Sequence, residues 1–158
     1  MKRSTYKHYL FDWGNTLMAD FPSEEGPMYQ WQHVEAVDGA KNLLRDLSNF
    51  ASCHLATNAK NSTVADIKKA LLRVELDTFI KKIFCFRGIG YEKPSKEFFN
   101  HILTSLDCEK NEIIMIGDNL EQDVYGALNA GIDAIWFNPQ NQPVPYGIKA
   151  ITSLNLII

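Results

Sequence analysis

The sequence of 158 residues predicts an α/β fold in which a parallel sheet of about five strands lies between two layers of helices. Short apolar runs alternate along the chain with segments whose apolar residues recur at helical spacing. The runs are apolar almost throughout, which is typical of parallel strands buried on both faces. The expected strands are His8–Asp12, Ser52–Thr57, Lys82–Phe86, Glu112–Gly117 and Ala134–Phe137.

Helices are expected in the intervals between these strands. The last of them is short and rich in small residues. Asn119, with Gln122 three residues later, resembles a capping pair at the start of this helix, and Gly131 is expected to end the helix. The expected helices are Gly39–Phe50, Ser62–Val74, Ser95–Leu106 and Glu121–Ala130.

The composition indicates a single globular domain over residues 1–158, since 46% of the residues are hydrophobic and 22% are charged. The net charge of −3 gives no footprint for general nucleic-acid binding. No apolar run approaches the ~20 residues of a membrane span, and the N-terminus lacks the apolar core of a signal peptide. We therefore expect a cytoplasmic protein without a membrane segment. Cys53 and Cys85 lie in apolar runs and are expected to be buried structural thiols.

Polar side chains follow the expected strands, where folds of this class bind their ligands. Asp12 and Asp118 each end an apolar run, and Thr57 and Asn58 end another. The irregular segment 18–37 is expected to form a long loop over these strand ends. A crevice lined by these groups is the expected functional site.

Two carboxylates brought together in such a crevice repel each other unless a cation or a proton intervenes. Asp12 alone is compatible with a nucleophile, a metal ligand or a helix cap. Asp118 beside it favours Mg²⁺, which proteins bind through one or two carboxylates together with water and substrate phosphate.

Phosphate ligands are available at the neighbouring positions. The Thr57 hydroxyl and the backbone N–H groups after the strand can hold phosphate oxygens, although a turn into the next helix is the alternative. Lys93 precedes Pro94 at the start of a helix, where a cation is locally unfavourable. This position indicates an anion or a carboxylate nearby, with a solvated surface lysine as the alternative.

Four short motifs occur in a fixed order along the chain: DWGNT at 12–16, ATN at 56–58, EKPS at 92–95 and GDNLEQD at 117–123. In this order the chain resembles the haloacid dehalogenase superfamily of hydrolases. The resemblance runs from the first strand to the last helix. It implies a Rossmann-like fold and a phosphatase that uses Mg²⁺.

The resemblance also implies roles for individual residues. Asp12 would be the nucleophile that forms an aspartyl-phosphate, which water then hydrolyses. Thr57 and Asn58 would hold the transferring phosphoryl group. Lys93 would neutralise charge on Asp12 and on the phosphate oxygens.

The metal ligands implied by the resemblance are Asp12, Asp118 and the backbone carbonyl of residue 14. Asp123 would bind Mg²⁺ through water or would orient Lys93. The family usually has a second aspartate two residues after the nucleophile, where it protonates the leaving group. Here that position is Gly14, which keeps the carbonyl but has no acid.

Loss of such a general acid typically costs about 10²–10⁴-fold in rate. We therefore expect weak turnover, or turnover of substrates with good leaving groups, unless a residue of the 18–37 loop replaces the acid. The candidate replacements are Asp20, Glu24, Glu25 and His33.

No segment is long enough for a large cap domain, so the chain resembles capless members of the family. Such members often take macromolecular substrates, or close the site by oligomerising. The expected partner of this chain is a phosphorylated small molecule or a phosphorylated macromolecule, and a homo-oligomer is compatible with the resemblance. The alternatives to a phosphatase are a non-catalytic phosphate-binding or interaction protein and a non-phosphate hydrolase such as a dehalogenase.

Overall fold

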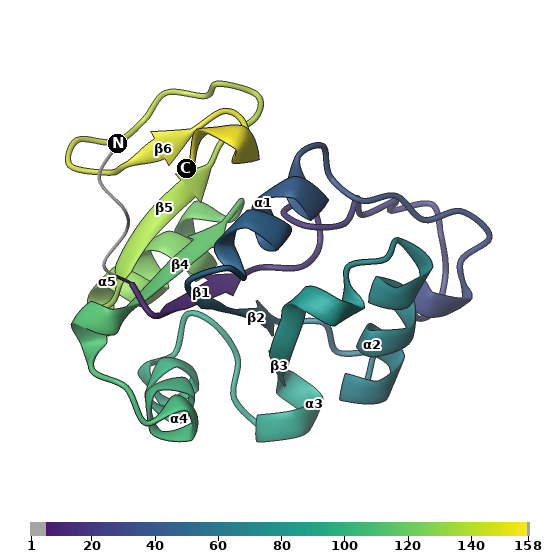
Figure 1. The fold of residues 1–158 in the computed structure, drawn as a ribbon, viewed down its shortest axis with the longest axis horizontal. Coiled ribbons are helices and arrows are strands. Elements are labelled where there is room, and N and C mark those ends of the chain that lie inside the picture. The colour runs from purple at the N-terminus through teal and green to yellow at the C-terminus, as the bar shows by residue number, and fades with distance from the viewer. Residues whose placement is uncertain (1–5, 158) are drawn as a thin grey trace.

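A computed structural model describes residues 6–157, and its centre is a six-stranded parallel sheet in the order β3-β2-β1-β4-β5-β6 (Figure 1). The predicted α/β class is confirmed, and each expected strand is present within a few residues. The strands are β1 (His8–Phe11), β2 (Ser52–Thr57), β3 (Ile80–Cys85), β4 (Ile113–Gly117), β5 (Asp133–Phe137) and β6 (Ala150–Ile151).

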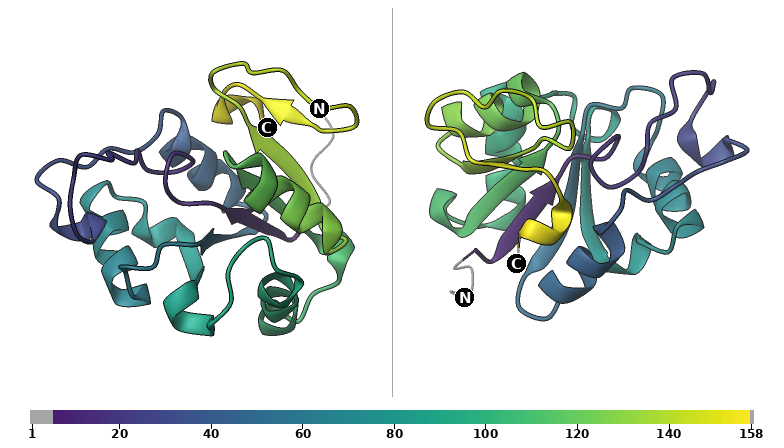
Figure 2. Two further views of the ribbon diagram at one scale, coloured as in Figure 1. Left: turned by 180° about the vertical axis from the view of Figure 1, so that it is seen from behind. Right: turned by 90° about the horizontal axis from the view of Figure 1, so that it is seen from above.

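Helices cover both faces of the sheet, which gives the three expected layers (Figure 2). One face carries α1 (Ala40–Leu47) and α2 (Val64–Arg73), and the other carries α4 (Lys96–Leu106) and α5 (Gly126–Asn129). The remaining helices are short: η1 (Met28–Gln30), η2 (Asp77–Phe79), α3 (Phe86–Ile89), η3 (Lys110–Glu112), the π-helix η4 (Leu120–Tyr125) and η5 (Leu154–Leu156).

Side chains alternate between two cores, as parallel strands require. Tyr9 and Phe11 of β1 belong to the core under α1 and α2, while Leu10 belongs to the core under α4 and α5. Cys53 and Cys85 are buried and unbridged, as expected. Within residues 6–157 no helix is both long and apolar enough to cross a membrane.

Three details differ from the prediction. The sheet has a sixth strand, β6, whose two residues are too few to produce a period in the sequence. Phe86, expected in a strand, begins the short helix α3, which ends at Gly90 in the left-handed conformation with φ +81°. The helix expected at 121–130 is a π-helix followed by α5, and π-helical turns occur frequently at functional sites.

The two ends of the loop at residues 18–37 are joined to each other, and its middle is attached to α2. Met18 and Ala36 form an isolated antiparallel bridge, which brings the ends of the loop together. In the middle, Arg73 of α2 donates hydrogen bonds to the backbone carbonyls of Tyr29, Trp31 and Gln32. The loop therefore has a fixed position over one side of the strand ends.

Candidate active site

Three adjacent strands bring their polar ends together at one edge of the sheet. Asp12 follows β1, Thr57 ends β2 and Asp118 follows β4, and β1 lies between the other two strands. The N–H of Asp12 still donates to the carbonyl of Ile116 at 3.0 Å, so sheet pairing fixes the backbone of Asp12. The structure thus brings these three polar residues to one edge of the sheet.

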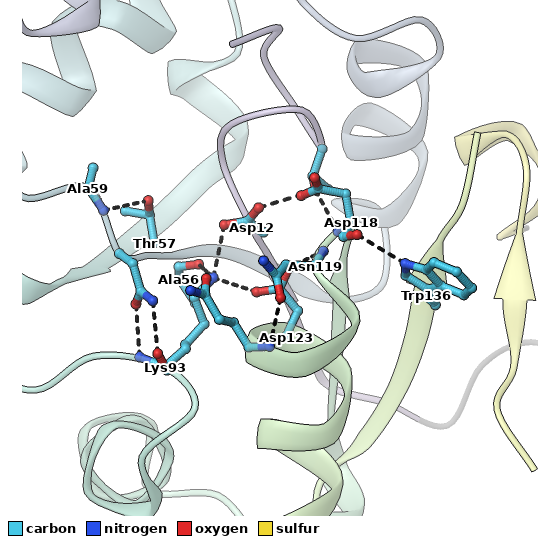
Figure 3. A network of polar contacts seen from close by, with 12 residues as sticks. Asp12, Ala56, Thr57, Ala59, Lys93, Asp118, Asn119, Asp123 and Trp136 are labelled. Atoms are coloured by element: carbon cyan, nitrogen blue, oxygen red, sulfur yellow. Dashed lines mark hydrogen bonds and ion pairs between the residues drawn. The ribbon is translucent and has the colours of Figure 1, made fainter. Parts of the chain in front are cut away.

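The Lys93 ammonium group is the centre of the polar network in Figure 3. Its Nζ donates to Asp123 Oδ1 at 2.6 Å, to the Ala56 carbonyl at 2.7 Å and to Asp12 Oδ1 at 2.9 Å. The residue is only 2% exposed. Burial alone would lower the pKa of Lys93, but the charges of Asp12 and Asp123 outweigh it and raise the pKa. Lys93 is therefore a fixed cation with all three donors in use.

Asn58 holds the backbone of Lys93 in place. The Asn58 side chain accepts from the Lys93 N–H at 2.8 Å and donates to the Lys93 carbonyl at 2.9 Å. Both ends of the Asn58 amide are thus engaged with the backbone of Lys93. Thr57 is buried, and its hydroxyl accepts from the Ala59 N–H at 3.2 Å.

Asp118 is oriented by two neighbours. Thr16 Oγ1 donates to Asp118 Oδ1 at 3.1 Å and accepts the Asp118 N–H at 3.2 Å. The indole N–H of Trp136 donates to the Asp118 carbonyl at 3.0 Å. Burial is the main cause that raises the pKa of Asp118. The side-chain hydrogen bond with Asp12 and the negative charge of Asp12 raise this pKa further.

Asp123 lies against the end of β4 and is completely buried. Its Oδ1 accepts from Lys93 and its Oδ2 accepts the Asn119 N–H at 3.0 Å. A Cβ on Gly117 would lie 2.1 Å from Asp123 Oδ2, so the carboxylate can take this position only because residue 117 is glycine. Burial and the charge of Asp12 raise the pKa of Asp123, against the lowering effect of Lys93.

These carboxylates offer oxygen ligands for a hard cation. Asp12, Asp118 and Asp123 each present an oxygen atom, and these atoms all lie within 4.8 Å of one another. Asp123 has both oxygens in use, whereas Asp118 has no cationic partner among the ion pairs of residues 6–157. Three crowded carboxylates beside one ammonium group leave excess negative charge, and oxygen ligands of this kind fit Mg²⁺.

The site opens into a cavity of about 310 Å³ between the strand ends and the 18–37 loop. Asp12 and Gly14 line the cavity together with four residues of the loop. The lining residues are Asp12, Trp13, Gly14, Asp20, Gly26, Met28, Trp31, Thr57, Asn58, Ala59 and Asn61. Four residues of the 18–37 loop therefore lie next to Asp12 along this cavity.

Two residues of the network were given no role by the sequence motifs. Thr16 lies inside the first motif and links it to Asp118, and Trp136 of β5 fixes the Asp118 carbonyl. The sequence signal for Thr16 is a hydroxyl side chain four residues after Asp12 in the first motif. Trp136 reads as an ordinary residue of a buried strand, and only the strand order β4-β5 brings it to the site.

The fold and this arrangement of carboxylates define a hydrolase-like α/β domain, and the comparisons with known proteins agree. A family model for haloacid dehalogenase-like hydrolases matches residues 10–137. The chain belongs to that family.

Relatives of similar sequence include enzymes of this family. The HAD-hydrolase YfnB of Bacillus subtilis is 32% identical over 110 residues, which are 69% of this chain and 46% of that protein. A glyceraldehyde 3-phosphate phosphatase of Pyrococcus abyssi is 34% identical over 108 residues, which are 68% of this chain and 44% of that protein. The chain thus spans about half the length of these relatives.

Solved structures share the fold over nearly the whole chain. An uncharacterised protein from Listeria monocytogenes serotype 4b superposes with a TM-score of 0.84 at 24% identity, covering 96% of this chain and 94% of that one. A structure of YfnB bound to magnesium superposes with a TM-score of 0.79 at 20% identity, covering 96% of each chain. At these identities the likeness concerns the fold.

Proposed function

We propose that the protein is a Mg²⁺-dependent phosphohydrolase that acts through an aspartyl-phosphate on Asp12. The observation that carries the proposal is the buried Lys93 ammonium, which pairs with both Asp12 and Asp123, and Asp12 in turn lines the cavity. A fixed cation beside a carboxylate suits a reaction in which negative charge gathers at that point. The phosphatase among the relatives supports the same class of reaction.

In the proposed reaction the Asp12 carboxylate attacks phosphorus and the bond to the leaving oxygen breaks. Lys93 stays protonated, keeps Asp12 ionised and offsets charge on the phosphoryl oxygens. Thr57 and the backbone N–H of Asn58 bind those oxygens from the β2 side. Water then attacks the phosphorus of the aspartyl-phosphate and releases inorganic phosphate from Asp12.

Mg²⁺ is the cofactor in this proposal, with Asp12, Asp118 and the Gly14 carbonyl as its ligands. When bound, Mg²⁺ neutralises the carboxylates and polarises the phosphoryl oxygens. Asp123, whose oxygens are both occupied, acts on the metal through water or by orienting Lys93. The magnesium bound in the YfnB structure supports the choice of this ion.

Gly14 has no side chain that could protonate a leaving group. Position 14 by itself therefore predicts a weak enzyme, or one restricted to substrates such as acyl and aryl phosphates that leave without a proton. Turnover of alkyl phosphates requires a donor from elsewhere in the cavity.

The substrate class in this proposal is a phosphorylated small molecule. The cavity of about 310 Å³ has the size of a small-ligand site, and Trp13, Met28 and Trp31 give it apolar surface. A phosphorylated macromolecule is the alternative, since within residues 6–157 the cavity is lined beside the strand ends by a loop, through Asp20, Gly26, Met28 and Trp31.

The test is hydrolysis of p-nitrophenyl phosphate and acetyl phosphate, with and without Mg²⁺. We expect metal-dependent turnover that Asp12→Asn abolishes. Asp46→Asn, an exposed carboxylate on α1, is the matched control and should retain full activity.

The other two functions give different results in the same experiment. If neither compound is hydrolysed while phosphate or Mg²⁺ still binds, the phosphatase proposal fails and a non-catalytic binding protein takes its place. Halide release from a 2-haloacid, lost in Asp12→Asn and independent of Mg²⁺, would instead identify a dehalogenase.

A further inference from the structure

The space beside Gly14 is filled by a carboxylate from another part of the chain. A Cβ on Gly14 would lie 3.6 Å from the Asp20 Cβ, 3.9 Å from its Cγ and 3.9 Å from its Oδ2. Any side chain at position 14 would thus point toward the Asp20 carboxyl group. Asp20 and Gly14 also line the same cavity as Asp12.

Two hydrogen bonds hold the backbone that leads into Asp20. Its N–H donates to the side chain of Asn15 at 2.9 Å, and Asn15 has the left-handed backbone conformation with φ +61°. The N–H of the preceding residue, Ala19, donates to the carbonyl of Glu35 at 2.9 Å. Asp20 therefore enters the cavity from a fixed segment, and its side chain makes none of these bonds.

The other acids of the site are already engaged. Asp118 is bound by Thr16, and Asp123 by Lys93 and Asn119. Among the residues that line the cavity, Asp12 and Asp20 are the carboxylates. If Asp12 is the nucleophile, Asp20 is the carboxyl group that remains for proton transfer.

The other loop residues considered from the sequence are less suited. Glu24, Glu25 and His33 are not among the residues that line the cavity. His33 is exposed like Asp20, but its Nε2 is paired with Glu35 Oε1 at 2.6 Å.

We propose that Asp20 is the general acid and base of this site, in place of a side chain at position 14. This inference rests on the proposed phosphohydrolase function. In the first step the Asp20 carboxyl gives its proton to the leaving oxygen as the P–O bond breaks and the bond from Asp12 to phosphorus forms. In the second step the Asp20 carboxylate takes a proton from the attacking water as phosphate leaves Asp12.

The closing experiment compares substrates that differ in how much their leaving group needs a proton. kcat/KM is measured with Mg²⁺ for acetyl phosphate, p-nitrophenyl phosphate, phenyl phosphate and an alkyl phosphate. The variants are Asp20→Asn, Asp20→Glu and the double variant Gly14→Asp/Asp20→Ala, in which the shorter residue 20 leaves room for a carboxyl group at position 14. The control is Glu25→Gln, which alters an exposed acid of the same loop outside the cavity.

Asp20→Asn should lose about 10²–10⁴-fold on the alkyl phosphate and less than about 10-fold on acetyl phosphate. The dependence of rate on leaving-group acidity should become steeper, which a purely structural loss would not produce. Asp20→Glu should recover part of the loss, and the double variant should recover it from position 14. Glu25→Gln should match the wild type.

Two results overturn the inference in different ways. If the wild type hydrolyses acetyl phosphate but Asp20→Asn lowers all substrates equally, or none of them, Asp20 is not the proton donor while the phosphohydrolase function stands. If the wild type hydrolyses no substrate, acetyl phosphate included, both proposals fail. Inorganic phosphate binding and thermal unfolding of Asp20→Asn, both expected to be unchanged, show that the variant is folded.

Discussion

Replacement of Lys93 by methionine should destabilise the protein strongly, because methionine fills a similar volume but removes the only cation that contacts Asp123 in the described ion pairs. Three hydrogen bonds of 2.6–2.9 Å end at Lys93 Nζ, and Asp123 is completely buried. Removing one partner of a buried ion pair typically costs about 3–5 kcal/mol. Total stabilities of domains are about 5–15 kcal/mol. We therefore expect Lys93→Met to lose a large part of the free energy of unfolding.

The assay is urea unfolding at neutral pH without Mg²⁺, with Lys60→Met as the matched control. Lys60 also forms an ion pair, with Glu92 at 3.3 Å, but its side chain is 64% exposed, and this variant should stay close to wild type. The double variant Lys93→Met/Asp123→Asn should lose less than the sum of the single losses, because the unpaired charge is gone. A loss below about 1 kcal/mol for Lys93→Met would refute the reasoning from buried charge.

Three further predictions concern the metal, pH and the loop. Mg²⁺ at about a hundredfold excess over its Kd should raise the free energy of unfolding by about 2.7 kcal/mol, and Asp118→Asn should remove this effect in thermal unfolding. Burial and the neighbouring His8 lower the pKa of His54 from 6.5 to about 4, so protons bind the unfolded chain more tightly between these values. The contribution of His54 to the free energy of unfolding should therefore fall by about 3 kcal/mol as pH drops from 6.5 to 4. Because the raised pKa values of Asp118 and Asp123 act in the opposite direction, this contribution is measured as the difference between wild type and His54→Leu in urea titrations at several pH values, and His101→Gln should follow the wild type. Arg73→Gln, which removes the bonds to three loop carbonyls, should speed amide hydrogen exchange in residues 28–32 and raise KM more than it lowers kcat.

Much of the fold follows from local patterns in the sequence. Apolar runs between helical segments specified the five longer strands, because each run is long enough to show its character. Apolar periodicity did not predict β6, because this strand has only two residues. It did not predict the π-helix η4 either, because the hydrogen-bonding pattern of a single π-helical segment does not change the spacing of apolar residues. Helix starts were readable where a side chain caps the backbone, as Asn119 does for the Gln122 N–H at 2.9 Å.

The site was predictable in its residue types and less so in their contacts. The positions of Asp12, Thr57 and Asp118 follow from strand ends in a parallel sheet. The sequence did not indicate that the Asn58 amide would be used up by the backbone of Lys93, since that pairing joins loops 35 residues apart. It offered Asp20 as one of four acids or bases in a loop, and only the folded loop separates Asp20 from the other three.

Gly117 is essential for the arrangement of the site although it has no reactive side chain. Even a methyl group there would occupy the place of the Asp123 carboxylate, which lies 2.1 Å from where a Cβ would be. Alanine at position 117 would displace the Asp123 carboxylate from Lys93. The Lys93 ammonium group would then lose one of the two ion pairs that hold it beside Asp12. In a screen of random substitutions, residue 117 would be as intolerant as the nucleophile itself, and activity data alone would rank it among the reacting groups.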